Sequence, residues 1–117
     1  PPILATDLFI DDKPAVYSPH DGIYGVWWQR DEALKLLQLK ADEQKAGTVS
    51  NAKPFLFYFA LQASHNPRQA PDEYNALYYM SKDTGNYDRI TMKAQTTTVD
   101  DAMKDIVTFI KDSGLWD

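Results

Sequence analysis

His65 is the residue of this sequence that is best placed to act in a functional site. It comes directly after a continuous apolar and aromatic run, Pro54 to Gln62, in the sequence Gln-Ala-Ser-His-Asn-Pro. In open α/β sheets, ligands bind beyond the carboxyl ends of the strands. A polar side chain at the end of a strand is therefore a candidate for binding or catalysis. The alternative interpretation is a loop histidine that hydrogen-bonds to nearby backbone.

Three pairs of adjacent carboxylates, Asp11-Asp12, Asp72-Glu73 and Asp100-Asp101, are the other groups suited to metal binding or acid–base work. Adjacent residues on a helix do not share a face. Capping and first-turn positions account for the second and third pairs, so we predict no metal site in this chain. Ser64 lies next to His65 but has no acid partner that the sequence identifies, and it is not predicted to be a nucleophile.

The run Pro54 to Gln62 must position His65. Its unbroken apolar character is typical of a strand buried on both faces in a sheet covered by helices. Such a strand needs neighbours on both sides to satisfy its N–H and C=O groups. No second strand of equal quality is present in the sequence.

Helices are predicted on both sides of this strand. The spacing of apolar residues predicts a helix over 31–46, and a short helix is expected from Pro71 to about Met80. A third helix carries Val99, Met103, Ile106 and Ile110 and ends at Gly114. The predicted fold class is thus α/β, helix-rich, with three helices and one buried aromatic strand at Pro54–Gln62.

Length and composition restrict the function classes. The 117 residues suffice for a single small domain, 1–117, in which the segment 1–28 is predicted to be irregular. The formal charge of −5 disfavours nucleic acid and anionic membrane surfaces as partners, and no apolar run is long enough to span a bilayer. There is no cysteine, which excludes disulfides and thiolate chemistry. The start Pro-Pro, without methionine, suggests a processed product.

Residues 53–74, KPFLFYFALQASHNPRQAPDEY, resemble type I sulfatases of the arylsulfatase B group, which share a strand of the form KPFFLYLAxQxxHxPLQxPxEY. The preceding segment, from Gly22 through the Arg30-Asp-Glu-Ala-Leu run, is similar to the helix before that strand. Residues 99–117 resemble the helix after it, with its Ser-Gly-Leu-Trp ending. The resemblance covers about residues 20 to 117.

The resemblance implies a large α/β domain with a mixed central sheet that hydrolyses aryl or glycosaminoglycan sulfate esters. The family uses a formylglycine nucleophile, made from Cys or Ser in a Cys/Ser-x-Pro-x-Arg motif, and a calcium ion. His65 matches a family position that contacts the sulfate or protonates the leaving oxygen, and His65 with Arg68 is the predicted substrate-binding pair. A secreted or lysosomal location follows by the same resemblance.

The departures from the family pattern concern the nucleophile and the metal. The sequence contains neither a cysteine nor a Ser-x-Pro-x-Arg motif. The family's early Asp pair would lie upstream of these residues, and its Asp-Asn pair would follow Asp117. Groups of an active site act as a unit. We therefore expect the chain alone, with no cofactor of its own, not to hydrolyse sulfate esters.

The alternative is a free-standing, secreted, non-catalytic protein with a signalling, attractant or binding role. The aromatic strand would then be repacked as helix or shielded by self-association, because an uncovered apolar edge is an aggregation hazard. This hypothesis predicts a mostly helical, oligomeric domain. A weaker hypothesis is residual binding of sulfate or a sulfated glycan through His65 and Arg68.

Overall fold

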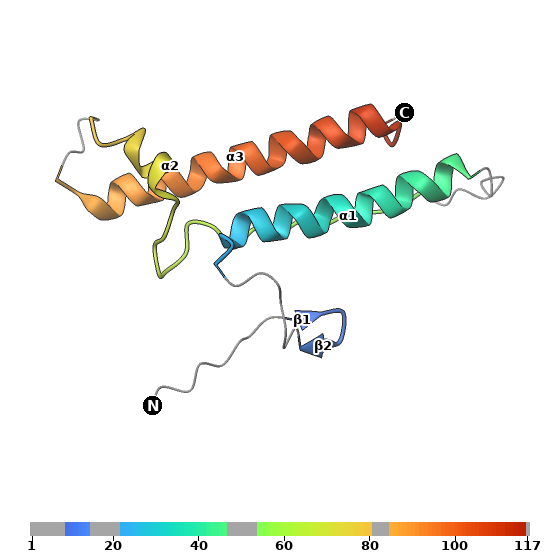
Figure 1. Cartoon of the computed structure of the whole chain (residues 1–117), viewed down its shortest axis with the longest axis horizontal. Coiled ribbons are helices and arrows are strands. Elements are labelled where there is room, and N and C mark those ends of the chain that lie inside the picture. Colours follow the sequence, from blue (N-terminus) through green and yellow to red (C-terminus); the bar gives the residue numbers. More distant parts are fainter. Residues whose placement is uncertain (1–8, 15–21, 47–53, 81–84, 117) are drawn as a thin grey trace.

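The chain is helix-rich, and its computed structural model is dominated by two long helices that lie side by side (Figure 1). The structure describes residues 9–14, 22–46, 54–80 and 85–116. The three predicted helices are present, whereas the described residues contain almost no strand. The elements are β1 (Phe9–Ile10), β2 (Lys13–Pro14), α1 (Gly25–Lys45), α2 (Asp72–Ala76) and α3 (Tyr87–Ser113).

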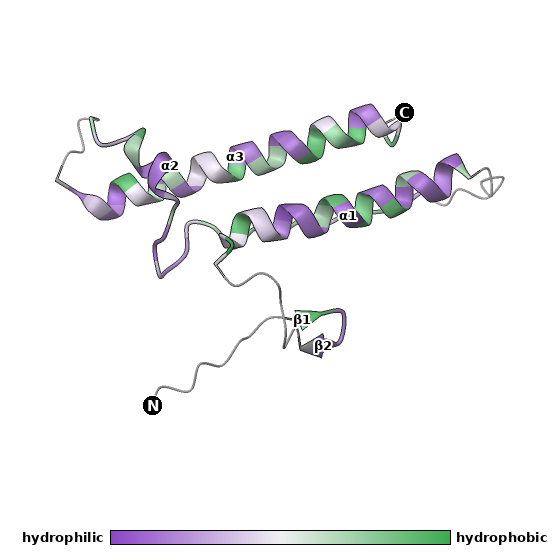
Figure 2. Cartoon of the chain, viewed as in Figure 1, coloured by the Kyte–Doolittle hydropathy of each residue, from purple (hydrophilic) through white to green (hydrophobic). Residues whose placement is uncertain are grey.

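Helices α1 and α3 run in the same direction and pack along their lengths (Figure 1). Hydrophilic residues interrupt the hydrophobic ones along both helices, so each buries only a narrow stripe (Figure 2). Small side chains on that stripe let the two backbones approach, and Leu37 and Ile106 fill the space between them. The alanines buried in this interface are Ala33, Ala41, Ala94 and Ala102.

Residues 54–62, which we call the aromatic segment, form an extended chain without strand pairing. The segment returns from the end of α1 to its beginning, antiparallel to both helices (Figure 1). Phe57 and Phe59 stack on each other at 5.9 Å and pack against the core between α1 and α3. Outward-facing Leu56 and Tyr58 are 95% and 87% exposed.

The prediction of a strand buried on both faces is therefore wrong for Pro54–Gln62. The period-two alternation of a strand is present, but only one face is covered. The unbroken apolar sequence predicted that both faces of the strand would be covered, but the described residues cover only one of them. The half-buried positions are Phe57, Phe59 and Leu61, and the exposed ones are Leu56, Tyr58, Ala60 and Gln62.

Helix α1 begins six residues earlier than predicted, at Gly25 instead of Asp31. The segment 1–28 is therefore not irregular throughout, since Gly25–Trp28 is helical and residues 9–14 form a short antiparallel hairpin. Val26 is buried and Trp27 packs against Tyr74 of α2. The stabilisation from these tertiary contacts outweighs the weak helix propensity of Gly25 and of the Trp27-Trp28 pair. Residues 22–24 have no regular secondary structure, and residues 1–8 and 15–21 lie outside the described residues.

Helix α3 is much longer than the periodic run 99–110 indicates, because it begins at Tyr87. Its N-terminus is capped by Asn86, whose side chain accepts a hydrogen bond from the Arg89 amide at 3.1 Å. The interpretation of Asp100 and Asp101 as capping or first-turn residues is therefore wrong, because both lie well inside α3. Thr96, Thr97 and Thr98 lie inside the helix with hydroxyls that donate to carbonyls three or four residues earlier.

Helix α3 ends at Gly114, as the sequence predicted. Gly114 adopts the left-handed conformation, with φ of 84°, and the Leu115 amide donates to the Ile110 carbonyl at 3.2 Å. This 6→1 hydrogen bond is typical of a helix that ends on a left-handed glycine. Leu115 then folds back onto the core, against the α1–α3 interface.

Helix α2 is held against α3 by a side-chain hydrogen bond. The Tyr74 hydroxyl donates to Asp101 Oδ2 at 2.6 Å, and a second tyrosine, Tyr78, contacts the Thr97 hydroxyl. Helix α2 covers only Asp72–Ala76 of the predicted 71–80. Arg30 connects the other pair of helices, since it bonds Asp105 of α3 at 3.1 Å.

Truncation of Leu37 should destabilise the fold. Its side chain is 1% exposed in the core that also holds Phe57, and Leu37→Ala is expected to lower the free energy of unfolding by about 2–5 kcal/mol. The matched control is Leu36→Ala, because Leu36 is 59% exposed one position away. Urea denaturation followed by circular dichroism measures both variants. Equal effects of the two would contradict the described orientation of α1.

Alkaline pH should loosen the contact between α2 and α3. The hydrogen bond to Asp101, followed by desolvation, raises the pKa of Tyr74 from 10.0 to about 12. Because the folded pKa exceeds the unfolded one, this stabilisation is complete below pH 10 and is lost between pH 10 and about 12. Unfolding by urea across that range measures the loss. Tyr74→Phe should abolish this part of the pH dependence, and an unchanged profile in the variant would contradict the assignment.

Candidate functional site

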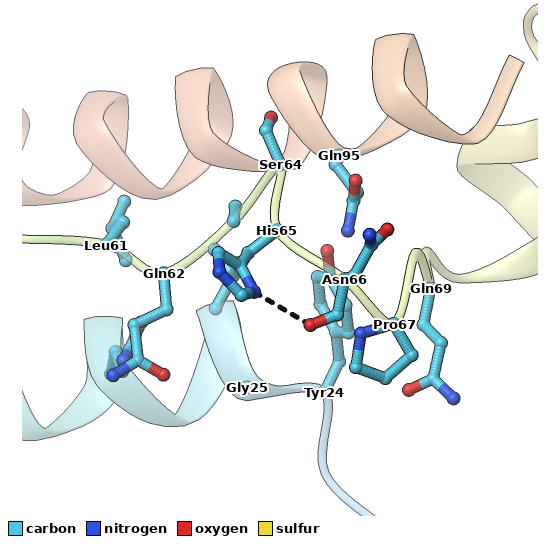
Figure 3. A pocket seen from close by; sticks show the side chains of 13 residues that line it. Tyr24, Gly25, Leu61, Gln62, Ser64, His65, Asn66, Pro67, Gln69 and Gln95 are labelled. Atoms are coloured by element: carbon cyan, nitrogen blue, oxygen red, sulfur yellow. Dashed lines mark hydrogen bonds between the residues drawn. The ribbon is translucent and has the colours of Figure 1, made fainter. Parts of the chain in front are cut away.

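The site lies where the aromatic segment ends, next to the beginning of α1 (Figure 3). It is an open cleft of about 680 Å³, and its lining comes from three parts of the chain. The N-terminal turn of α1 forms one side and residues 61–67 with Gln69 form another, while Gln95 reaches in from α3 (Figure 3). The segment that packs on the helix pair therefore also places the residues that follow it at the helix ends.

His65 lines this cleft, as expected for a residue at the end of the extended run. Its Nδ1 lies 2.7 Å from the carbonyl oxygen of Asn66 (Figure 3). A carbonyl can only accept, so Nδ1 carries the proton in this contact, and the neutral ring has its lone pair on Nε2. The interpretation of His65 as a loop histidine bonded to nearby backbone describes this contact, and the same residue also lines the cleft.

The turn that carries His65 departs from the extended conformation at Ser64. Ser64 has a φ of 67°, the left-handed region that a non-glycine residue occupies at a cost of about 1–2 kcal/mol. Unfavourable backbone conformations of this kind cluster at functional sites. The turn takes the chain off the direction of the aromatic segment, and His65 follows it at the mouth of the cleft (Figure 3).

Uncharged amides make up most of the polar lining of the cleft. None of its thirteen lining residues is Asp, Glu, Lys or Arg, and His65 is the only histidine among them. An anion that enters meets no carboxylate, and amide groups can both donate and accept hydrogen bonds. The amide side chains are Gln29, Gln62, Asn66, Gln69 and Gln95.

The position of Gln95 is fixed by contacts within α3 and by the start of α1. Gln95 is 4% exposed, and its backbone carbonyl accepts from the Thr98 hydroxyl at 2.7 Å. The same hydroxyl lies 3.3 Å from that of Tyr24, which also lines the cleft. This contact ties the N-terminal turn of α1 to α3 directly beneath the residues around His65.

Arg68, the second predicted substrate-binding residue, does not line the cleft. Its guanidinium forms an ion pair with Asp88 at 3.1 Å, so it is directed to the N-terminal turn of α3. The structure therefore does not bring Arg68 and His65 together in one site.

Several lining residues were not singled out by sequence reasoning. Tyr24, Gln29 and Gln95 come from parts of the chain far from His65 in sequence. The signal that could have identified Gln95 is its position one helical turn before Val99, on the same side of the helix. It was missed because the helix was expected to begin at about residue 99.

The described residues do not fit the calcium ion of the resembled family, and the sequence does not contain the motif from which its formylglycine is made. Within the described ranges no group of three or more His, Cys, Asp or Glu side chains could hold a metal ion. The full sequence has no cysteine and no Ser-x-Pro-x-Arg motif. No chemical step through either group can be assigned to these residues.

No helix within the described parts of the chain is long and apolar enough to cross a membrane. No model of a known protein family matches this chain, and no solved structure matches it either. A functional assignment therefore has to come from the resemblance of residues 53–74 and from the geometry of the cleft.

Proposed function

We propose that this chain is a segment of a sulfatase-like α/β domain in which His65 contacts the sulfate group of an ester substrate. The observation that carries the proposal is the place of His65. It lines a cleft directly beyond the carboxyl end of an extended aromatic segment, and two parallel helices cover one face of that segment. Open α/β sheets bind their ligands at this position.

The arrangement of the helices supports a sheet-based parent fold. Helices α1 and α3 run opposite to the aromatic segment, as helices in α/β units run opposite to the strands that they connect (Figure 1). The exposed face of the segment is also apolar, with Leu56 and Tyr58 almost fully accessible. A strand that is apolar on both faces is typical of a sheet covered on both sides.

The proposed role of His65 is limited to what an imidazole can do at this site. As an imidazolium it donates a hydrogen bond to a sulfate oxygen or transfers a proton to the leaving oxygen of the ester. The contact of Nδ1 with the Asn66 carbonyl leaves Nε2 as the nitrogen for that task. The nucleophile has to come from residues that this chain does not contain.

The proposal predicts sulfate-ester binding that depends on His65. Titration of the chain with 4-nitrophenyl sulfate, followed by ¹⁵N–¹H NMR of the histidine rings, should give a saturable shift of the His65 resonances. His65→Asn should weaken binding by about tenfold or more, since a hydrogen bond between charged groups contributes about 1.5–3 kcal/mol. A shift of equal size with 4-nitrophenol would show that the aryl group alone binds.

Arg68→Ala provides the matched control for that titration. Because Arg68 pairs with Asp88 outside the cleft, its removal should leave the affinity for the sulfate ester nearly unchanged. A loss as large as that of His65→Asn would contradict the described geometry. Absence of any saturable His65 shift would contradict the proposed function itself.

Binding should occur without turnover. The 117-residue chain, assayed with 4-nitrophenyl sulfate in the presence of calcium, is expected to release nitrophenol no faster than buffer, because it has no cysteine and no Ser-x-Pro-x-Arg motif from which formylglycine is made. Release above the buffer rate that disappears in His65→Asn would contradict this account of the catalytic groups.

A second candidate function is a free-standing, non-catalytic protein with a signalling, attractant or binding role. The observation that favours it is the core between α1 and α3, where Leu37 and Ile106 are buried without any sheet. Far-UV circular dichroism dominated by helix, with cooperative unfolding and no His65 shift on sulfate addition, would support it over the first proposal. A spectrum dominated by strand would contradict it.

A further inference from the structure

We propose that the aromatic segment accepts a β-strand from another polypeptide, which pairs with an open edge of residues 55–61 and lies on the α1–α3 layer. This inference concerns an interaction surface and does not depend on the sulfatase proposal. It follows from the unpaired backbone of the segment, from the width of the helix layer and from the distribution of charge.

Among the described residues, no backbone group pairs with either edge of the segment. None of the backbone–backbone hydrogen bonds between described residues involves residues 54–70. In a strand, the N–H and C=O of one residue point to the same edge, and successive residues alternate. Even-numbered residues therefore open to one edge and odd-numbered residues to the other. Such a row of unpaired groups is a template for an added strand.

The helix layer is wider than one strand. Packed helices lie about 8–10 Å apart, whereas neighbouring strands lie about 4.8 Å apart. Two helices side by side therefore cover roughly four strands, and the described residues place a single extended segment on them. The layer has room for further strands beside residues 55–61.

An apolar side chain remains exposed on α1 beside the segment. On α1, Leu36 is 59% exposed and lies between Ala33, in the core under the segment, and Lys40, whose ammonium lies 6.0 Å from the Phe55 ring. An added strand would cover this side chain and remove its apolar surface from water.

The charge distribution defines the chemistry of the partner strand. No charged residue occurs between Lys53 and Arg68, so a long stretch of the acceptor is uncharged. The matching strand is uncharged in its middle and carries apolar side chains at alternate positions, which face the helices. Charges are tolerated at its ends, beyond the uncharged stretch of the acceptor.

A second whole copy of this chain does not fit as the occupant. In a two-fold antiparallel pair, directly opposite residues share a face of the sheet. Both copies would then carry their helix pairs on that same face, with strands only about 4.8 Å apart and helices that require 8–10 Å. The self-association expected from the sequence is therefore replaced by pairing with a strand that has no helix layer on that face.

The test is hydrogen exchange measured by NMR on the complete 117-residue chain. The probe is a soluble synthetic peptide of about nine alternating valine and threonine residues between pairs of lysines. Its addition should slow the exchange of every second amide within residues 55–61 by about tenfold or more, in a saturable way. The control peptide has prolines in place of two central threonines, so it has equal charge but cannot pair.

Two variants identify the edge. Tyr58 is 87% exposed, so Tyr58→Ala leaves the core contacts and the backbone N–H in place. Tyr58→Pro removes that N–H. If even-numbered amides are protected, Tyr58→Pro should abolish the protection and Tyr58→Ala should keep it; if odd-numbered amides are protected, both variants should keep it.

Three results would overturn the proposal. The first is no protection, or protection that does not alternate along residues 55–61. The second is equal protection by the proline control peptide. The third is a discrete dimer of the chain alone in which the same amides are protected, since that would show a second copy to be the occupant. None of these results affects the proposed sulfate contact of His65, which is measured independently.

Discussion

The packing of Phe57 and Phe59 into the groove between α1 and α3 is the contact on which the rest of this structure depends. The helices meet through small side chains, and their shared core is limited to a few residues around Leu37 and Ile106. Two stacked phenyl rings enlarge that core and fix the direction of the chain between the helices. Because the segment runs back to the start of α1, His65 lies in the lining of the cleft there.

The same contact leaves the segment half covered. The helices cover the side chains on its inward face, whereas the side chains on its outward face are exposed. Its backbone makes no hydrogen bond with the backbone of other described residues. One short stretch of the chain therefore has two candidate binding surfaces. The end of the segment holds His65 in an uncharged, amide-lined cleft, and its edges offer hydrogen-bonding groups above a helix layer that is wider than one strand.

Sequence reasoning predicted the features that local patterns determine. The three helices, the glycine end of α3 and the placement of His65 beyond the apolar run follow from periodicity and capping rules. It was wrong where tertiary contacts decide. Helix α1 extends back to Gly25 because Val26 is buried, and α3 extends through its three threonines because Thr98 is buried and Thr97 contacts Tyr78. The cleft residues Tyr24 and Gln95 were missed because only the folded chain brings them to His65.

The central claim is that Phe57 and Phe59 anchor the aromatic segment on the α1–α3 core. Nuclear Overhauser effects between the phenyl rings and the methyl groups of Leu37 and Ile106, in a sample with those methyls labelled, test it most directly. The account predicts strong effects from both rings to these methyls and none from Tyr58, which faces outward. Absence of ring-to-methyl effects, or effects from Tyr58 instead of its neighbours, would contradict it.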